Sequence, residues 1–238
     1  MTCTTVGGVA VSALITGGTG GLGAAVTRVF LDGGWRVVVP LHDERERERV
    51  GTHERLVLEP GDLFDPAGAA AMATLAAGDD EAPLRALVNL VGGFAMGKRL
   101  HETPVEDFED QLRLNLRPTY LACQAVLPHL QAAGGGAIVC VSSRSALRPF
   151  AGASGYVVSK AAVLALVDVL AEEYRRDAIR VNAILPSVVD TPANRSSMPD
   201  ADHQRWVAPE QIASVVRFLC EDGSQAVSGA HLPVYGRA

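Results

Sequence analysis

Apolar and polar residues along this chain follow two alternating patterns. Short runs of β-branched and other apolar residues, which favour strands, alternate with longer segments whose apolar residues recur at helical spacing. Strands that are apolar throughout are typical of a parallel sheet covered by helices on both faces. The pattern predicts strands over residues 11–16, 36–40, 55–59, 86–91, 137–142, 179–185 and 230–234, and helices over 22–31, 66–76, 104–127, 155–175 and 209–221.

The alternation of strands and helices is not interrupted by a linker, a repeat or a low-complexity segment. We therefore expect residues 1–238 to form one α/β domain, doubly wound, with a seven-stranded parallel sheet flanked by helices on both faces. The predicted helix over 155–175 is apolar around most of its circumference, which requires cover on two sides. One side is expected to face the sheet and the other a second subunit.

The composition fits a soluble globular protein, because 48% of the 238 residues are hydrophobic and 20% are charged. The formal net charge is −6, and the chain has no basic cluster of the kind that binds nucleic acid or an anionic membrane. The tract over residues 43–49 alternates in charge and is interpreted as a solvated face. Only two of the 21 basic residues are lysines, Lys98 and Lys160, so each of them calls for a specific explanation.

The sequence gives no sign of export, a membrane span or a metal site. The apolar stretch over 9–15 has no basic segment before it and runs into glycines, unlike a signal peptide. The longest uncharged stretch, 118–143, is broken by Pro128 and a run of glycines. The six histidines show no metal-ligand spacing. We expect a cytoplasmic protein with widely spaced, buried and reduced cysteines, Cys3, Cys123, Cys140 and Cys220.

A glycine-rich turn, TGGTGGLG over residues 16–23, lies between the first predicted strand and the first predicted helix. Backbone N–H groups at a helix N-terminus bind phosphate, and glycines permit the tight turn and the close approach of the ligand. Both Gly18-x-Gly20-x-x-Gly23 and Gly17-x-x-x-Gly21-x-Gly23 fit the turn. The turn therefore predicts a site for the pyrophosphate of a dinucleotide.

The choice between NAD and NADP is expected to depend on residues at the end of the second strand. A carboxylate there bonds the ribose 2′-hydroxyl, whereas a basic side chain accepts a 2′-phosphate. Asp43 lies about 20 residues beyond the glycine turn, as an NAD site requires. His42 and Arg45 are equally near for a phosphate. The sequence leaves both cofactors open.

Tyr156 and Lys160 lie four residues apart at the start of a predicted helix, so they share one helix face. A tyrosine hydroxyl, with a reference pKa of about 10, exchanges protons poorly near neutral pH unless a cation stabilises the phenolate. Lys160 is placed to supply that cation. Ser142 is the last residue of the fifth predicted strand, and Ser143 follows it.

In the order and spacing of these motifs the whole chain resembles the short-chain dehydrogenase/reductase family. The resemblance implies a Rossmann-type domain, NAD or NADP as the cofactor, and Asn115, Ser143, Tyr156 and Lys160 as the catalytic residues. Ser143 is preferred to Ser142 because it lies 13 residues before Tyr156 (156 − 143). The cofactor-binding residues expected from the turn, the second strand and the resemblance are Gly17, Thr19, Gly20, Gly21, Leu22, Gly23, His42, Asp62, Leu63, Asn89, Gly92, Tyr156, Lys160, Pro186, Val189 and Thr191.

The resemblance also implies the reaction, the interconversion of a carbonyl and a secondary alcohol by hydride transfer. Tyr156 is expected to act as the general acid and base, and Ser143 to hydrogen-bond the reacting oxygen. Lys160 is expected to favour the phenolate and to bind the nicotinamide ribose, with Asn115 supporting it through water. The chain departs from the family pattern near the cofactor without losing a catalytic group, at Leu41, Leu90, Pro118 and Ser187.

Two other functions stay open. A regulator that senses the dinucleotide could keep the fold without turnover. A nucleotide-sugar epimerase or dehydratase is suggested by the spacing Gly17-x-x-Gly20-x-x-Gly23, although such enzymes carry a larger C-terminal substrate domain than this chain has room for.

The substrate is expected to be a small carbonyl or alcohol compound with a mainly apolar body. The segment over 192–207 is expected to cover it. Arg144 and Arg148 follow Ser143 and could meet an acidic substrate, although a solvent-exposed or subunit-contact role is favoured. The family resemblance and the apolar helix over 155–175 imply a homodimer or homotetramer. Expected pocket walls are Gly93, Phe94, Phe150, Val188, Met198 and Trp206.

Overall fold

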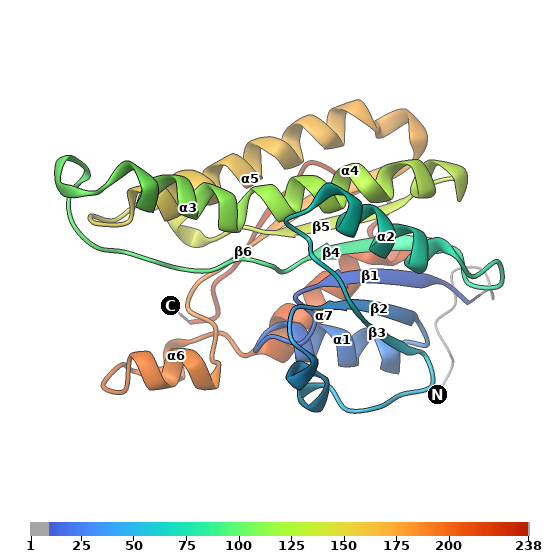
Figure 1. The fold of residues 1–238 in the computed structure, drawn as a ribbon, viewed down its shortest axis with the longest axis horizontal. Helices are drawn as coiled ribbons and strands as arrows, with labels where there is room; N and C mark the ends of the chain where they lie inside the picture. The colour runs from blue at the N-terminus through green and yellow to red at the C-terminus, as the bar shows by residue number, and fades with distance from the viewer. Residues whose placement is uncertain (1–9, 238) are drawn as a thin grey trace.

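The structure, a computed structural model, describes residues 10–237, so Cys3 and the start of the predicted apolar stretch lie outside it. Seven parallel strands form one sheet in the order β3-β2-β1-β4-β5-β6-β7. The expected α/β fold with a seven-stranded parallel sheet is confirmed (Figure 1). The strands are β1 (Ser12–Thr16), β2 (Arg36–Leu41), β3 (Leu56–Pro60), β4 (Leu84–Asn89), β5 (Gly136–Val141), β6 (Ile179–Pro186) and β7 (His231–Val234).

Helices cover both faces of the sheet (Figure 1). Leu14 and Val38 point to one face and join a core cluster with residues of α2, α4 and α5. Ile15 and Val37 alternate to the other face and pack with α1 and α7. The helices are α1 (Gly23–Asp32), α2 (Pro66–Ala77), α3 (Val105–Asn115), α4 (Arg117–Ala132), α5 (Ser154–Glu173), α6 (Pro192–Ser197) and α7 (Pro209–Cys220).

The apolar helix α5 is partly buried against the sheet. Val163 and Val167 lie in the core, whereas Val158 and Val169 are 43% and 51% exposed. By length and composition alone α5 could cross a membrane, but core helices of soluble proteins pass the same test. Within residues 10–237, α5 therefore keeps exposed apolar side chains on its outer face, as the sequence predicted.

The prediction of one helix over 104–127 is wrong, because the helix is interrupted at Leu116, between α3 and α4. Pro118 has no backbone N–H and its ring disfavours a continuous helix. Side chains satisfy the backbone groups at the break: the Asn115 amide donates to the Gln111 carbonyl at 3.1 Å, and the Thr119 hydroxyl donates to the Asn115 carbonyl at 3.0 Å. The interruption places Asn115 at the C-terminus of α3, where its side-chain amide bonds neighbouring backbone groups.

Strand β4 ends at Asn89, two residues earlier than the predicted end at Val91. Residues 90–93 therefore form a loop at the carboxyl end of the sheet. The cysteines that the structure describes, Cys123, Cys140 and Cys220, are free and buried, as expected.

Candidate active site

The order of the strands places a crevice at the carboxyl ends of β1 and β4. After β1 the chain adds β2 and β3 on one side, and from β4 onward it adds strands on the other. In open parallel sheets, ligands bind where the strand order reverses in this way. A cavity of about 420 Å³ lies at this edge, bordered by residues of the loops after β1, β4, β5 and β6, among them Leu22, Gly92, Ser143 and Val188.

The glycine turn after β1 is shaped by close backbone contacts. Gly17 has φ +67°, and its carbonyl accepts the N–H of Gly20 at 3.0 Å. A Cβ atom on Gly23 would lie 1.9 Å from the Gly17 oxygen, so only glycine fits there. Helix α1 begins without a side-chain cap and without an acidic residue in its first turn. These features fit the pyrophosphate of a dinucleotide, for which Gly17, Gly20, Gly23 and the neighbouring Leu22 would supply the backbone cradle.

Gly21 of the same turn lies against the loop after β6. A Cβ atom on Gly21 would lie 2.8 Å from the methyl group of Thr191. The Thr191 hydroxyl accepts the N–H of Asn194 at 3.2 Å and caps α6. Pro186 and Val189 line the cavity beside it. The expected cofactor residues of the two loops are thus brought together.

Tyr156 reaches the cavity from the first turn of α5, next to the loop after β5. Burial raises the pKa of the Tyr156 hydroxyl above its ordinary value, and the neighbouring Ser143 and Ser145 hydroxyls offset part of this increase. The Ser145 hydroxyl donates to the Ser143 hydroxyl oxygen at 2.9 Å. Sequence reasoning did not include Ser145, although its position two residues after Ser143, in a short turn, is the signal that could have found it.

The neighbouring Ser142 has a different place in the structure. Its hydroxyl donates to the backbone carbonyl of Lys160 at 2.7 Å and is buried. This bond ties α5 to the end of β5. Ser142 thus has a structural partner, and Ser143 is the serine of this pair whose hydroxyl affects Tyr156.

Lys160 lies one helical turn beyond Tyr156 and is almost fully buried. Its ammonium donates to the Val141 carbonyl at 3.1 Å. Burial lowers the pKa of Lys160 to about 8. A Cβ atom on Gly92 would lie 2.6 Å from Asn115 Oδ1 and 3.1 Å from Lys160 Nζ, so these three residues adjoin one another.

Asn115 is fixed on both sides of its amide. Its Oδ1 accepts the N–H of Gly93 at 3.0 Å, and its Nδ2 donates to Gln111 as described above. Asn115 is fully buried. It holds the loop after β4 against α3.

Ten of the expected cofactor residues lie outside the lining of this cavity, namely Gly17, Thr19, Gly20, Gly21, Gly23, His42, Asp62, Leu63, Asn89 and Thr191. Asn89 is buried, and its Nδ2 donates to the thiols of Cys123 and Cys140 at 3.3 and 3.6 Å, so its side chain anchors the end of β4. Leu63 is packed in the core. Asp62, in the loop after β3, accepts the N–H of Phe64 at 2.8 Å.

Glu46, which was not predicted from the sequence as a site residue, connects the segment after β2 to the glycine turn. The hydroxyl of Thr19 donates to the carboxylate of Glu46 at 3.0 Å. Glu46 lies in a 3₁₀ helix, η1 (Glu44–Arg49), within the tract interpreted as a solvated face. That interpretation is wrong for Glu46, whereas His42 at the end of β2 is exposed. Only the fold brings residues 19 and 46 together.

Each arginine of this tract is paired with a carboxylate. Arg45 pairs with Asp43 and Arg47 with Glu44, while Arg49 lies 3.4 Å from Glu46. The guanidinium groups near the end of β2 thus all have carboxylate partners, and Glu46, the partner of Arg49, also lies at the glycine turn.

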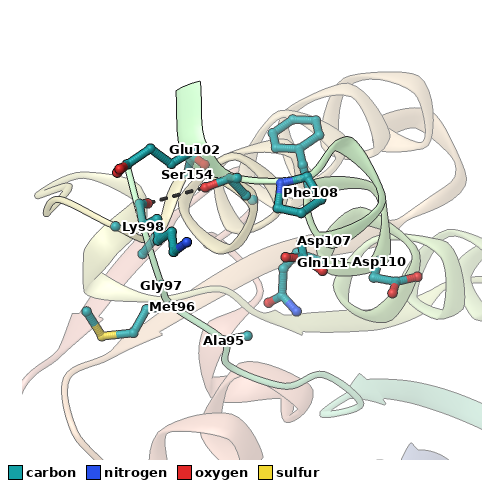
Figure 2. A pocket seen from close by; sticks show the side chains of 15 residues that line it. Ala95, Met96, Gly97, Lys98, Glu102, Asp107, Phe108, Asp110, Gln111 and Ser154 are labelled. Atoms are coloured by element: carbon teal, nitrogen blue, oxygen red, sulfur yellow. Dashed lines mark hydrogen bonds between the residues drawn. The ribbon is translucent and has the colours of Figure 1, made fainter. Parts of the chain in front are cut away.

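A second cavity, of about 630 Å³, lies between residues 95–98, the start of α3 and residues 152–155 (Figure 2). Lys98 lines it together with Glu102 and Asp107. Tyr156 and Lys160 do not line this cavity, so the second lysine of the chain stands outside the candidate active site.

The fold and the site define a dinucleotide-dependent oxidoreductase. A sequence model described as short chain dehydrogenase matches residues 11–202, and the chain belongs to the short-chain dehydrogenase/reductase family. It is an oxidoreductase that interconverts a carbonyl and an alcohol with NAD or NADP.

Individual relatives cover nearly the whole chain. It is 32% identical to "2-(R)-hydroxypropyl-CoM dehydrogenase" of Xanthobacter autotrophicus, over 94% of this chain and 96% of the relative. It is 31% identical to "D-threitol dehydrogenase" of Mycolicibacterium smegmatis, over 94% and 91%. The solved structure "ElxO with NADP Bound" shares the fold with a TM-score of 0.88 at 23% identity, over 95% of this chain and 98% of that one.

Proposed function

We propose that Tyr156, Ser143, Lys160 and Asn115 form the catalytic site of this oxidoreductase. The observation that carries the proposal is the convergence of Tyr156, Ser143 and Lys160 on one cavity beside the glycine turn. Asn115 adjoins Lys160 outside the cavity lining. The bound dinucleotide would supply the hydride acceptor or donor. The small alcohols in the names of the relatives support this class of substrate.

The chain's own groups handle the proton. In the direction of reduction, Tyr156 donates its hydroxyl proton to the carbonyl oxygen of the substrate. The Ser143 hydroxyl donates a hydrogen bond to the same oxygen and fixes its position. The Lys160 ammonium stabilises the phenolate that remains, and Asn115 holds the backbone around Lys160. Oxidation of the alcohol reverses these steps.

The proposal assigns both sites to one domain. The residues of the glycine turn, Gly17, Thr19, Gly20, Gly21, Leu22 and Gly23, would bind the pyrophosphate and the adjoining ribose. His42 and Asp62 would lie on the adenine side, where the buried Leu63 and Asn89 would support the backbone. Gly92, Pro186, Val189 and Thr191 would lie on the nicotinamide side. Residues 192–207, which include α6, would cover the substrate. A cytoplasmic location is supported by the free buried cysteines.

The experiment is a steady-state assay with a panel of ketones, aldehydes and alcohols, run in parallel with NAD(H) and NADP(H). Turnover with at least one compound is expected. A dinucleotide that raises the melting temperature without any turnover across the panel would favour a sensor instead.

Glu46 leads us to expect that NAD binds more tightly than NADP. A carboxylate at the glycine turn can accept the ribose 2′-hydroxyl and repels a 2′-phosphate. Glu46→Gln is therefore expected to tighten NADP binding by roughly tenfold and to change NAD binding much less. The measurement is calorimetric titration of both dinucleotides.

Glu48→Gln serves as the control, because Glu48 is an exposed carboxylate in the same 3₁₀ helix. Equal changes in the affinity for NAD and for NADP in the Glu46 variant would contradict this role.

We also propose a homo-oligomer that buries the outer face of α5. Val158, Ala162, Leu166 and Val169 follow one another at helical spacing, and Tyr120 of α4 is exposed beside Ala162 and Leu166. Exposed apolar surface of this kind marks an interface.

The expected solution mass is therefore a multiple of 25.0 kDa. Val169→Glu is expected to lower the mass measured by light scattering toward that of one chain, whereas Thr74→Glu, at an exposed position of α2, is not. A wild-type monomer would refute the proposal.

A further inference from the structure

The cavity beside Tyr156 is positively charged, although the chain as a whole carries a net charge of −6. Its charged lining residues are Arg144, Arg148 and Lys160, and its lining contains no aspartate or glutamate. Lys160 is buried and has a place in the proposed mechanism. The two arginines have none so far.

Arg144 and Arg148 project from the turn that begins at Ser143. The N–H of Arg148 donates to the Arg144 carbonyl at 2.9 Å, so the two residues stand one helical turn apart. Arg144 begins the 3₁₀ helix η3 (Arg144–Ala146) directly after the serine that contacts Tyr156. The turn that places Ser143 in the cavity lining therefore also places the guanidinium-bearing Arg144 and Arg148 there.

Neither arginine has a carboxylate partner among residues 10–237. Arg144 lies over the ring of Tyr235, 5.7 Å from its centroid, which holds the guanidinium without neutralising it. By contrast, acidic groups lie within ion-pair distance of many other arginines of the described chain, namely Arg36, Arg45, Arg47, Arg49, Arg55, Arg175, Arg195 and Arg217.

The remaining wall of the cavity is aromatic. The ring of Phe94 meets that of Tyr156 edge to face, with centroids 4.9 Å apart, and lies 6.3 Å from the ring of Phe150. Phe94 and Phe150 are 58% and 45% exposed, so part of each ring faces solvent. A flat apolar group bound against these rings would remove them from water.

We propose that the substrate is an aldehyde or ketone, or the matching alcohol, whose flat apolar body carries a carboxylate or a sulfonate, and that Arg144 and Arg148 bind this anion. Guanidinium groups form paired, charge-assisted hydrogen bonds with such oxyanions. The anion fixes the far end of the substrate, so that its carbonyl is held at Tyr156 and Ser143. This inference rests on the proposed catalytic site.

The reaction keeps the balance of the oxidoreductase. In reduction, the carbonyl carbon gains a hydride from the reduced dinucleotide, the C=O π bond breaks, and the oxygen takes the proton of Tyr156. The carboxylate or sulfonate of the substrate contributes only to binding and is chemically unchanged in the product.

The test compares 4-formylbenzoate with its uncharged methyl ester and with 4-formylbenzamide. In the wild-type enzyme, kcat/KM is expected to be at least roughly tenfold higher for the acid than for either neutral compound. Arg148→Gln and the double variant Arg144→Gln/Arg148→Gln are expected to remove this preference, mainly through a higher KM for the acid. Values for the ester are expected to change little.

Arg176→Gln is the matched control, because Arg176 is exposed and lies outside the lining of the cavity. Dinucleotide affinity, measured in the same variants, is expected to be unchanged. A loss of that affinity would mean that the arginines serve the cofactor, and would overturn the inference.

Binding of non-reacting analogues keeps the two proposals separate. In the presence of NAD or NADP, 4-methylbenzoate is expected to bind the wild type at least tenfold more tightly than 4-methylbenzamide, and Arg148→Gln to abolish the difference. Turnover of the neutral aldehydes without any preference for the acid would overturn the inference and leave the oxidoreductase standing. Preferential binding of the acid without turnover would support the anion site and count against the catalytic assignment.

Discussion

Replacing Tyr156 with phenylalanine is expected to lower kcat for carbonyl reduction by about 10³-fold. The substitution removes the hydroxyl that exchanges the proton, while the ring keeps its edge-to-face contact with Phe94. The substitution leaves the glycine turn unchanged and removes an interaction made only in the transition state. Dinucleotide affinity is therefore expected to stay within about twofold of the wild-type value. Steady-state kinetics and titration of the dinucleotide measure the two quantities.

Tyr174→Phe provides the control, since Tyr174 lies at the far end of α5 and packs against the core. Retained activity in the Tyr156 variant would show that another group supplies the proton. A parallel loss of dinucleotide binding would show instead that the variant has lost the shape of the site.

Replacing Lys160 with methionine is expected to abolish most of the activity and to stabilise the cofactor-free protein at pH 7. Burial lowers the pKa of Lys160 from 10.5 to about 8. At about 1.4 kcal/mol for each pKa unit, the buried ammonium costs about 3 kcal/mol of folding free energy at neutral pH. Losing its hydrogen bond to Val141 offsets about 1–2 kcal/mol of the gain.

The gain in stability is expected to depend on pH. Below pH 8 the lysine is charged in both the folded and the unfolded state, so the full cost of burial is present. Between pH 8 and pH 10.5 the folded state has lost the proton that the unfolded state still binds, and the wild type becomes more stable as the pH rises. Above pH 10.5 the cost is gone.

Thermal melts at pH 7 and pH 10 therefore measure the effect. The Lys160 variant is expected to melt a few degrees above the wild type at pH 7 and no higher than it at pH 10. Lys98→Met, at the only other lysine, controls for the loss of a lysine. A Lys160 variant less stable than the wild type at pH 7 would contradict the prediction, because it would show that the buried ammonium contributes favourably to the folding free energy.

The fold could be predicted from sequence because its signals are local. The buried strands are continuous apolar runs, and the glycine turn joins the first of them to a helix. The helix break at Leu116 was missed because apolar spacing continues through it, although Pro118 carried the signal.

The site was predictable where spacing along the chain carries the information. The four-residue interval of Tyr156 and Lys160 and the proximity of Ser143 follow from one helix and one loop. The contact of Glu46 with Thr19 joins residues 27 positions apart, and the contacts of Asn89 with two thiols depend on packing between elements. Such contacts have no local signature.

The most direct test of the account is the transfer of deuterium from dinucleotide deuterated at the reactive position of the nicotinamide ring to a carbonyl compound, followed by mass spectrometry. The wild type is expected to yield an alcohol with one deuterium on the carbinol carbon, and Tyr156→Phe to yield almost none while still binding the dinucleotide. Equal incorporation of deuterium by the wild type and the variant would contradict the assignment of Tyr156 as the proton donor.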